Sequence, residues 1–115
     1  MSRSVRLYLS DILDASETIL QYVRQSDPVS FSKVRMRIEA CARNIEVIGE
    51  ASRCLPKTVR DAMPGIPWNR IIGMRNILAH AYYQIDYDVI WSVSHNHIDH
   101  LLKAIKTYME SADLE

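Results

Sequence analysis

Apolar residues recur every three or four positions along most of the chain, and this period is the strongest constraint on its fold. Such spacing places side chains on one face of an α-helix, whereas a half-buried strand alternates with a period of two. No segment of the sequence has the pattern of a strand. We therefore predict an all-α protein with helices near residues 4–25, 31–55, 67–82 and 86–112.

Helix-breaking residues separate these four segments. Pro56 stops the second helix, and a turn cluster over residues 64–67 precedes the third. Pro67 suits the first residue of the third helix, Asp86 suits the cap of the fourth, and residues 57–63 can form a short helical turn. The first two helices and the last two are joined by short connections, which favour antiparallel neighbours. The expected fold is an antiparallel up-and-down four-helix bundle.

Composition limits the size and the partners of the protein. The chain has 115 residues, of which 48% are hydrophobic, and this suits one domain over residues 1–115. Residues 1–75 carry twelve Lys and Arg against eight Asp and Glu (+4), and residues 76–115 carry two against six (−4). A nucleic-acid-binding domain often has a pI above about 9, but the pI here is near 6.9. Any contact with RNA should therefore be local.

The sequence also bears on the compartment. It has no stretch of about 18 uncharged apolar residues, and the N-terminal segment is interrupted by Arg6, Ser10 and Asp11. We expect no membrane span, no secretory signal and a cytoplasmic location. Cys41 and Cys54 lie thirteen positions apart on one expected helix, which separates them by roughly 20 Å. They cannot form a disulfide within the chain.

The third helix combines apolar residues on nearly every side with an arginine in its main apolar stripe. Trp68, Ile71 and Leu78 share this stripe with Arg75, which stands where a leucine would be expected. A second stripe is small or polar and consists of Asn69, Gly73, Asn76, His80 and Tyr83. Gly73 weakens a helix interior by about 1 kcal/mol relative to alanine and suggests that another backbone approaches closely. We infer a homodimer that packs on this helix.

Arg75 and His80 are five residues apart, about 140° around an ideal helix, so a straight helix does not direct both at one atom. Two arrangements would bring them together. The helix can unwind near His80, or a two-fold axis can set both residues of one subunit against those of the other. The structural alternative is that a buried Arg75 pairs with Glu46 or Glu50 while His80 caps the helix end.

Three blocks of the sequence, in this order, resemble the HEPN superfamily. The string RNILAHAY at residues 75–82 fits the RxxxxHxY pattern of HepT-like toxins, which pair with minimal nucleotidyltransferase antitoxins. Residues 43–51 are similar to the second helix of that family, and residues 66–75 to the segment that leads into the motif. The resemblance covers nearly the whole chain. It implies an all-helical homodimer with the motifs in a shared cleft and a metal-independent ribonuclease activity.

The residues support this chemistry independently. Attack of a ribose 2′-OH on the adjacent phosphate needs a base, an acid and a group that stabilises the charge on the phosphorane. A histidine titrates near neutrality, so His80 can supply base and acid from the two subunits. Arg75 offers a planar fork to phosphate oxygens, and Asn76 can orient the imidazole or the ligand. No clustered carboxylates suggest a two-metal site, and no metal or other cofactor is expected.

The resemblance also implies how the activity is controlled. A cognate nucleotidyltransferase antitoxin would transfer AMP from ATP to Tyr82, the motif tyrosine. Tyr82 lies two residues beyond His80 and on the Arg75 stripe, so an adenylyl group there would occupy the Arg75 fork and repel RNA. The alternative is that Tyr82 only closes the cleft or bonds across the dimer, and the adjacent Tyr83 can be confused with it.

Two functional classes follow. The first is a toxin that cleaves cellular RNA, with tRNA as the target that several relatives suggest. The second is a non-catalytic HEPN module that binds nucleotide or RNA and acts through complex formation. The intact Arg75 and His80 favour the first class.

Other polar groups are expected to be structural or solvated. His97 and His100 could share a metal, but no third ligand is evident nearby, and His95 is expected to be solvated with them. Glu46 and Glu50 lie one turn apart and could form an acid/base pair. We expect them instead to pair with Arg75 or Arg43, and we expect Trp68 and Trp91 to be core residues.

Overall fold

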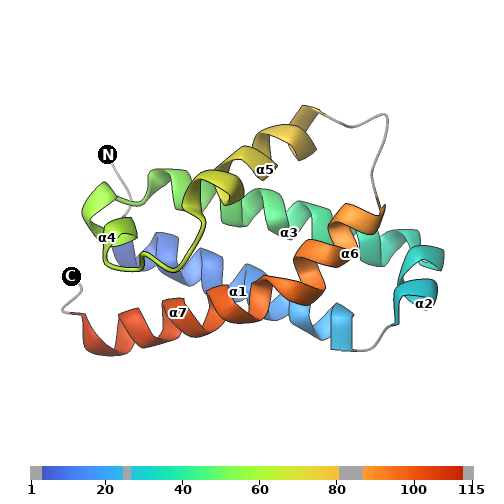
Figure 1. Cartoon of the computed structure of the whole chain (residues 1–115), viewed down its shortest axis with the longest axis horizontal. Helices are drawn as coiled ribbons and strands as arrows, with labels where there is room; N and C mark the ends of the chain where they lie inside the picture. The colour runs from blue at the N-terminus through green and yellow to red at the C-terminus, as the bar shows by residue number, and fades with distance from the viewer. Residues whose placement is uncertain (1–3, 25–26, 81–86, 113–115) are drawn as a thin grey trace.

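The computed structural model describes residues 4–24, 27–80 and 87–112, without the side chains of Pro28, Ser32, Ile77, Ala79, His80 and Tyr87. Within these ranges the chain forms helices and no strand, which confirms the all-α class for the described residues (Figure 1). The helices are α1 (Val5–Arg24), α2 (Pro28–Lys33), α3 (Arg35–Cys54), α4 (Lys57–Asp61), α5 (Trp68–His80), α6 (Tyr87–Asn96) and α7 (Ile98–Ser111).

The core forms around α1, which lies between α3 on one side and α7 on the other (Figure 1). Apolar side chains that the helical period predicted to face inward are buried here, among them Leu9, Ile12, Ile19, Ile38, Cys41, Ile45, Ile48, Ile90, Ile98, Leu101 and Ile105. The main packing contact of α5 is with α3, on the far side from α1. Helix α5 therefore lies on the outside of the described core.

The predicted second helix over residues 31–55 is in fact two helices. Val34 has an extended backbone between α2 and α3. Asp27 and Ser30 form a capping box at the start of α2: the Asp27 carboxylate accepts from the Ser30 backbone N–H (2.8 Å), and the Ser30 hydroxyl accepts from the Asp27 N–H (3.1 Å). The change of direction at Val34 lets α2 also contact α6, where Phe31 is fully buried.

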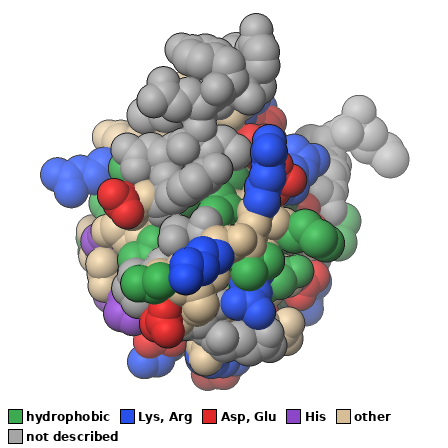
Figure 2. Space-filling view, turned by 90° about the vertical axis from the view of Figure 1, so that its right-hand side faces the viewer, with side chains coloured by type: hydrophobic (Ala, Val, Ile, Leu, Met, Phe, Trp, Pro, Cys, Tyr) green, Lys and Arg blue, Asp and Glu red, His purple; other side chains and the backbone are tan. Residues whose placement is uncertain are grey.

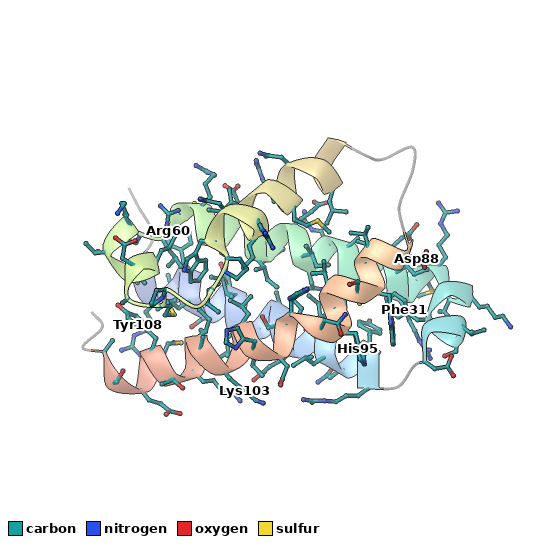
Figure 3. The ribbon with its side chains drawn as sticks, viewed as in Figure 1. Phe31, Arg60, Asp88, His95, Lys103 and Tyr108 are labelled. Atoms are coloured by element: carbon teal, nitrogen blue, oxygen red, sulfur yellow. The ribbon has the colours of Figure 1, made fainter. Side chains whose placement is uncertain are left out.

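The predicted fourth helix over residues 86–112 is also interrupted. His97 separates α6 from α7, although backbone hydrogen bonds from His97 to Val93 and from Leu101 to His97 continue across the bend. Trp91 on α6 packs against Phe31 (5.0 Å between ring centroids) and stacks on His95. Figure 3 shows Phe31 and His95 in this part of the molecule. The bend therefore lets α6 contact α2 and α3, while α7 follows α1. The expected cap, Asp86, lies outside the described residues.

The connection between the second and third predicted helices agrees closely with expectation. Helix α3 ends one residue before Leu55, and α4 is the predicted short helical turn. Helix α5 begins at Trp68, one residue later than predicted, because the carbonyl of Pro67 accepts the first helical hydrogen bonds from Arg70 and Ile71. The predicted end at residue 82 lies outside the described residues.

The surface at the α2 end mixes apolar and basic side chains, as Figure 2 shows from that side. Three exposed apolar residues come from this part of the chain, Val29, Val34 and Met36. None of the described helices is long and apolar enough to cross a membrane. Both cysteines are free, as predicted, and burial raises the pKa of the Cys41 thiol to about 11.

Candidate functional site

The position of Arg75 is set by a close crossing of α5 over α3 at Gly49. A Cβ built at Gly49 would collide with the Cβ of Arg75 and would lie 3.0 Å from the carbonyl oxygen of Ile71. Only a residue without a side chain fits at this crossing. The sequence predicts a close approach of another backbone at Gly73 instead, but a Cβ there would meet no described atom within 4 Å. Gly49, which the sequence reasoning missed, therefore sets the backbone of Arg75 against α3.

The guanidinium of Arg75 is held at two of its three nitrogens. Its Nε forms an ion pair with Oε2 of Glu50 at 3.1 Å, and its Nη1 donates to Oδ1 of Asn76 at 2.6 Å. Among the described residues, Nη2 has no hydrogen-bond partner. The side chain is 36% exposed and so is not the buried arginine of the structural alternative. The plane of the guanidinium is thus fixed while one of its edges remains available.

Glu50 is shared between two arginines. Arg53 donates to it through Nη2 (2.6 Å) and Nε (3.2 Å), while Arg75 approaches from α5. The hydrogen bond from Arg53, aided by the positive charges of Arg53 and Arg75, holds the pKa of the Glu50 carboxyl below its usual value. Glu46 pairs with Arg43 at 3.3 Å. Both glutamates are therefore ion-pair partners, as predicted, and Arg53 is the member of the cluster that the sequence reasoning missed.

A cavity of about 280 Å³ lies beside these groups, between α1, α3 and α5. Its charged lining consists of Asp11, Arg43, Glu46, Glu50 and Arg75, and we call it the Arg75 cavity. Three carboxylates and two guanidinium groups make its lining slightly acidic. A phosphate would therefore be expected to meet Arg75 at its free edge, beside Asn76, and not deep inside this cavity.

The structure places Asn76 and His80 on the same helix as Arg75. Asn76 is exposed and follows Arg75 directly. Helix α5 continues to His80, so no unwinding occurs before that residue, and an ideal helix puts His80 about 7.5 Å further along the axis than Arg75. The imidazole of His80 and the whole of Tyr82 and Tyr83 lie outside the described residues. Their predicted roles stay predictions.

The remaining candidates are accounted for by packing or by solvent. His95, His97 and His100 are exposed, and the last two line an apolar cavity of about 220 Å³. Within the described parts of the chain, no three His, Cys, Asp or Glu side chains are placed to hold a metal ion together. Trp68 is buried, as predicted, and Trp91 is half-buried against the core.

Comparison with known proteins agrees with the resemblance to the HepT-like family. The family model described as "Ribonuclease HepT-like" matches residues 12–108. A protein of Methanocaldococcus jannaschii named "Putative RNase" is 33% identical over 90% of this chain and 95% of its own length. A protein of Thermococcus cleftensis named "Probable ribonuclease HepT" is 37% identical over 79% of this chain and 83% of its own. No solved structure gives a significant match.

Proposed function

The chain belongs to the HepT-like ribonuclease family of HEPN proteins, and on this premise we propose that it is the endoribonuclease toxin of a toxin–antitoxin pair. The observation that carries the proposal is the guanidinium of Arg75, which is fixed at Nε and Nη1 and has a free edge beside Asn76. A fork fixed in this way can stabilise charge on a phosphate in the transition state without further reorganisation. Cellular RNA, tRNA included, is the proposed substrate class.

The proposed active form is a homodimer in which a second copy covers α5 and completes the packing of the four-helix bundle. Four described apolar residues of α5 are only partly buried in the single chain, namely Ile71, Ile72, Met74 and Leu78. Gly73, on the adjacent stripe, has no described atom near its Cβ position. Helix α5 is helical up to His80, and a two-fold axis is the way we propose to bring Arg75 and His80 of the two subunits together.

The proposed reaction needs no metal. His80 accepts the proton of a ribose 2′-OH as that oxygen forms a bond to the adjacent phosphorus. Arg75 and Asn76 hold the oxygens of the phosphorane, on which negative charge builds up. The bond to the 5′-oxygen then breaks, and the partner subunit's His80 donates a proton to that oxygen. The products are one end with a 2′,3′-cyclic phosphate and one with a 5′-hydroxyl.

Cleavage of tRNA by the purified protein in the presence of EDTA tests this proposal. We expect 2′,3′-cyclic phosphate ends with the wild type and no cleavage with Arg75→Ala or His80→Ala. The exposed His95 provides a matched control, and His95→Ala should cleave normally. A strict requirement for added metal would reject the mechanism. Binding of RNA without any cleavage by the wild type would favour the non-catalytic module instead.

Measurements of stability distinguish a catalytic role of Arg75 from a purely structural one. Its ion pair with Glu50 is partly exposed, so its loss should cost less than about 1 kcal/mol. Arg75→Ala should therefore melt within a few degrees of the wild type, since about 1 kcal/mol corresponds to roughly 4 °C in a domain of this size. A large loss of stability would support a purely structural salt bridge.

For regulation, we propose that a minimal nucleotidyltransferase antitoxin transfers AMP to Tyr82. An adenylyl group adds negative charge next to the motif and would compete with the substrate phosphate for Arg75. Mass spectrometry of protein co-expressed with the transferase should find AMP on the peptide that contains Tyr82. Tyr82→Phe should remain toxic in the presence of the transferase, and Tyr83→Phe should be neutralised. Neutralisation of Tyr82→Phe would mean that control comes from binding alone.

A further inference from the structure

A second polar cavity lies at the opposite end of α5 from His80. It is an open groove of about 710 Å³ between α4 and the first turn of α5. Its lining includes Lys57, Arg60, Asp61, Trp68, Asn69 and Arg70, and we call it the α4–α5 groove. Three cations therefore face one carboxylate. This excess is local, because the formal charge of the whole chain is zero.

Two of the three cations have no acidic partner in the described part of the chain. Lys57 pairs with Asp61 at 2.8 Å, one turn away on α4. Neither Arg60 nor Arg70 forms a described ion pair, and the Nε of Arg60 is buried without a hydrogen-bond partner in the described residues. A buried donor without a partner is costly, so an acceptor from outside the chain would stabilise it. The groove is thus suited to bind an anion.

The backbone around Arg60 is held in place before any ligand binds. Trp68 is buried, and its Nε1 lies 3.1 Å from the carbonyl oxygen of Arg60 and 3.2 Å from that of Met63. These two contacts connect α4 to the start of α5, where Figure 3 shows Arg60. The backbone that carries the cations is therefore fixed before a ligand binds. Binding then costs less conformational entropy than it would if the cations were on a mobile loop.

The groove and the candidate active site share one face of α5. On an ideal helix Asn69 lies within about 20° of Asn76 and of His80, and about 17 Å along the axis from His80. Helix α5 is continuous over this distance. The groove, at the end of α5 away from His80, is therefore within reach of an RNA a few nucleotides longer than the segment held at the candidate active site. The Arg75 cavity, by contrast, is slightly acidic and adds little attraction for a polyanion.

We propose that the α4–α5 groove is an accessory site that binds a backbone phosphate of the RNA substrate, away from the bond that is cut. This inference rests on the proposed ribonuclease function. Arg60 and Arg70 bind the phosphate, and Lys57 adds positive charge at the edge of the groove. Contacts of this kind position a nucleic acid without reading its bases, so the groove strengthens binding to many sequences.

Binding of a ten-nucleotide RNA with 2′-O-methyl riboses tests the site, because such an RNA cannot be cut by 2′-OH attack. We expect Arg60→Gln/Arg70→Gln to weaken binding about tenfold at low salt. It should also make the slope of log K against log[salt] shallower by about 0.7, which is the contribution of one phosphate contact on a single strand.

The matched control removes two cations of α7 that do not line the groove, in Lys103→Gln/Lys106→Gln. Lys103 pairs with Asp99 at 2.8 Å, as Lys57 pairs with Asp61, and Figure 3 shows Lys103 on the other side of the molecule from Arg60. This control should leave the salt slope nearly unchanged. An equal effect of the two double variants, or no effect of either, would overturn the proposal. Arg70→Gln/Lys57→Gln, which changes only exposed side chains, repeats the test if the Arg60 variant melts early.

Substrate length separates this site from the active site. A dinucleotide substrate can fill the site at Arg75 and His80 but cannot reach the groove. We expect the groove variants to cut it as fast as the wild type does, and to cut a ten-nucleotide RNA less efficiently because KM rises. Groove variants that bind and cut the longer RNA normally, together with an inactive His80→Ala, would remove the accessory site but keep the proposed function. RNA binding that depends on the groove, without any cleavage by the wild type, would instead keep the accessory site and reject the proposed ribonuclease function.

Discussion

The Arg75 cavity and the α4–α5 groove use arginines in opposite ways. In the Arg75 cavity, Arg75 and Arg43 each have a glutamate partner, and Arg53 completes the pairing of Glu50. In the groove, Arg60 and Arg70 have no acidic partner in the described residues, and only Lys57 is paired. An arginine held by carboxylates has a fixed direction, and an arginine without them keeps its charge for an outside anion. This difference matches a catalytic role in one region and a binding role in the other.

Arg75→Lys makes the strongest test of this contrast. A lysine keeps the positive charge but cannot donate to Glu50, to Asn76 and to a phosphate in one fixed plane. We expect the rate of single-turnover cleavage to fall about 100-fold or more. In the groove, where charge and not direction matters, Arg70→Lys should retain nearly all RNA binding. If Arg75→Lys cleaves RNA as well as the wild type, as Arg70→Lys is expected to bind it, the two regions do not differ in how they use their arginines.

Gly49, where α5 crosses α3, and Gly73, which has no described atom near its Cβ position, provide a second test. Gly49→Ala forces a Cβ into Arg75 and the α5 backbone, so we expect a loss of about 1–3 kcal/mol in the free energy of unfolding. Gly73→Ala meets no described atom and should stabilise the monomer by up to about 1 kcal/mol, because alanine favours a helix. Denaturant unfolding of both variants measures the difference.

The same pair of variants examines the proposed dimer. If the partner's backbone approaches at Gly73, the added methyl group should raise the dissociation constant of the dimer in sedimentation experiments. A Gly73→Ala protein that is both more stable and equally dimeric would place the interface elsewhere. Monomeric wild type at micromolar concentration would argue against a composite site altogether.

The sequence predicted the positions of the helices well, because each buried stripe repeats along the chain. It did not predict the bends at Val34 and His97. The stripe expected to face inward continues across His97 from Ser94 to Ile98, so the pattern itself contains no sign of a break. Such bends depend on which helices pack together, and that is decided by contacts between distant parts of the chain.

The candidate site could be predicted only in part for the same reason. Arg75 was noticeable because a charge interrupts an apolar stripe, and its pairing with Glu50 was one of two pairings foreseen from the sequence. The need for glycine at position 49 comes from a crossing between two helices, and its only local sign is a glycine in a helix interior, the same sign that pointed to Gly73. Arg60 and Arg70 are ordinary surface cations in the sequence, and only the fold brings them into one groove.

Glu50→Gln tests whether the carboxylate positions Arg75. The amide keeps the shape of the side chain but removes the charge that both arginines share. We expect kcat to fall about tenfold with little change in KM, because a less firmly oriented guanidinium stabilises the transition state less well. Glu46→Gln is the matched control, since Glu46 pairs with Arg43 and not with Arg75. A similar loss of kcat in both variants would point to a general charge effect.

The smallest expected effect is a pH dependence of stability that comes from Glu50. Its pKa in the folded protein is held below the usual value by Arg53 first and Arg75 second, so the folded state binds fewer protons than the unfolded state near pH 4. The stabilisation is therefore complete above the unfolded pKa of about 4.3 and disappears as the pH falls through the lower folded pKa. Glu50 is 43% exposed, so the amount should be below about 1 kcal/mol. Urea unfolding should find the wild type slightly more stable than Glu50→Gln at pH 7, and this difference should shrink as the pH falls below about 4.3. A difference that does not change with pH would assign the effect to packing instead of charge.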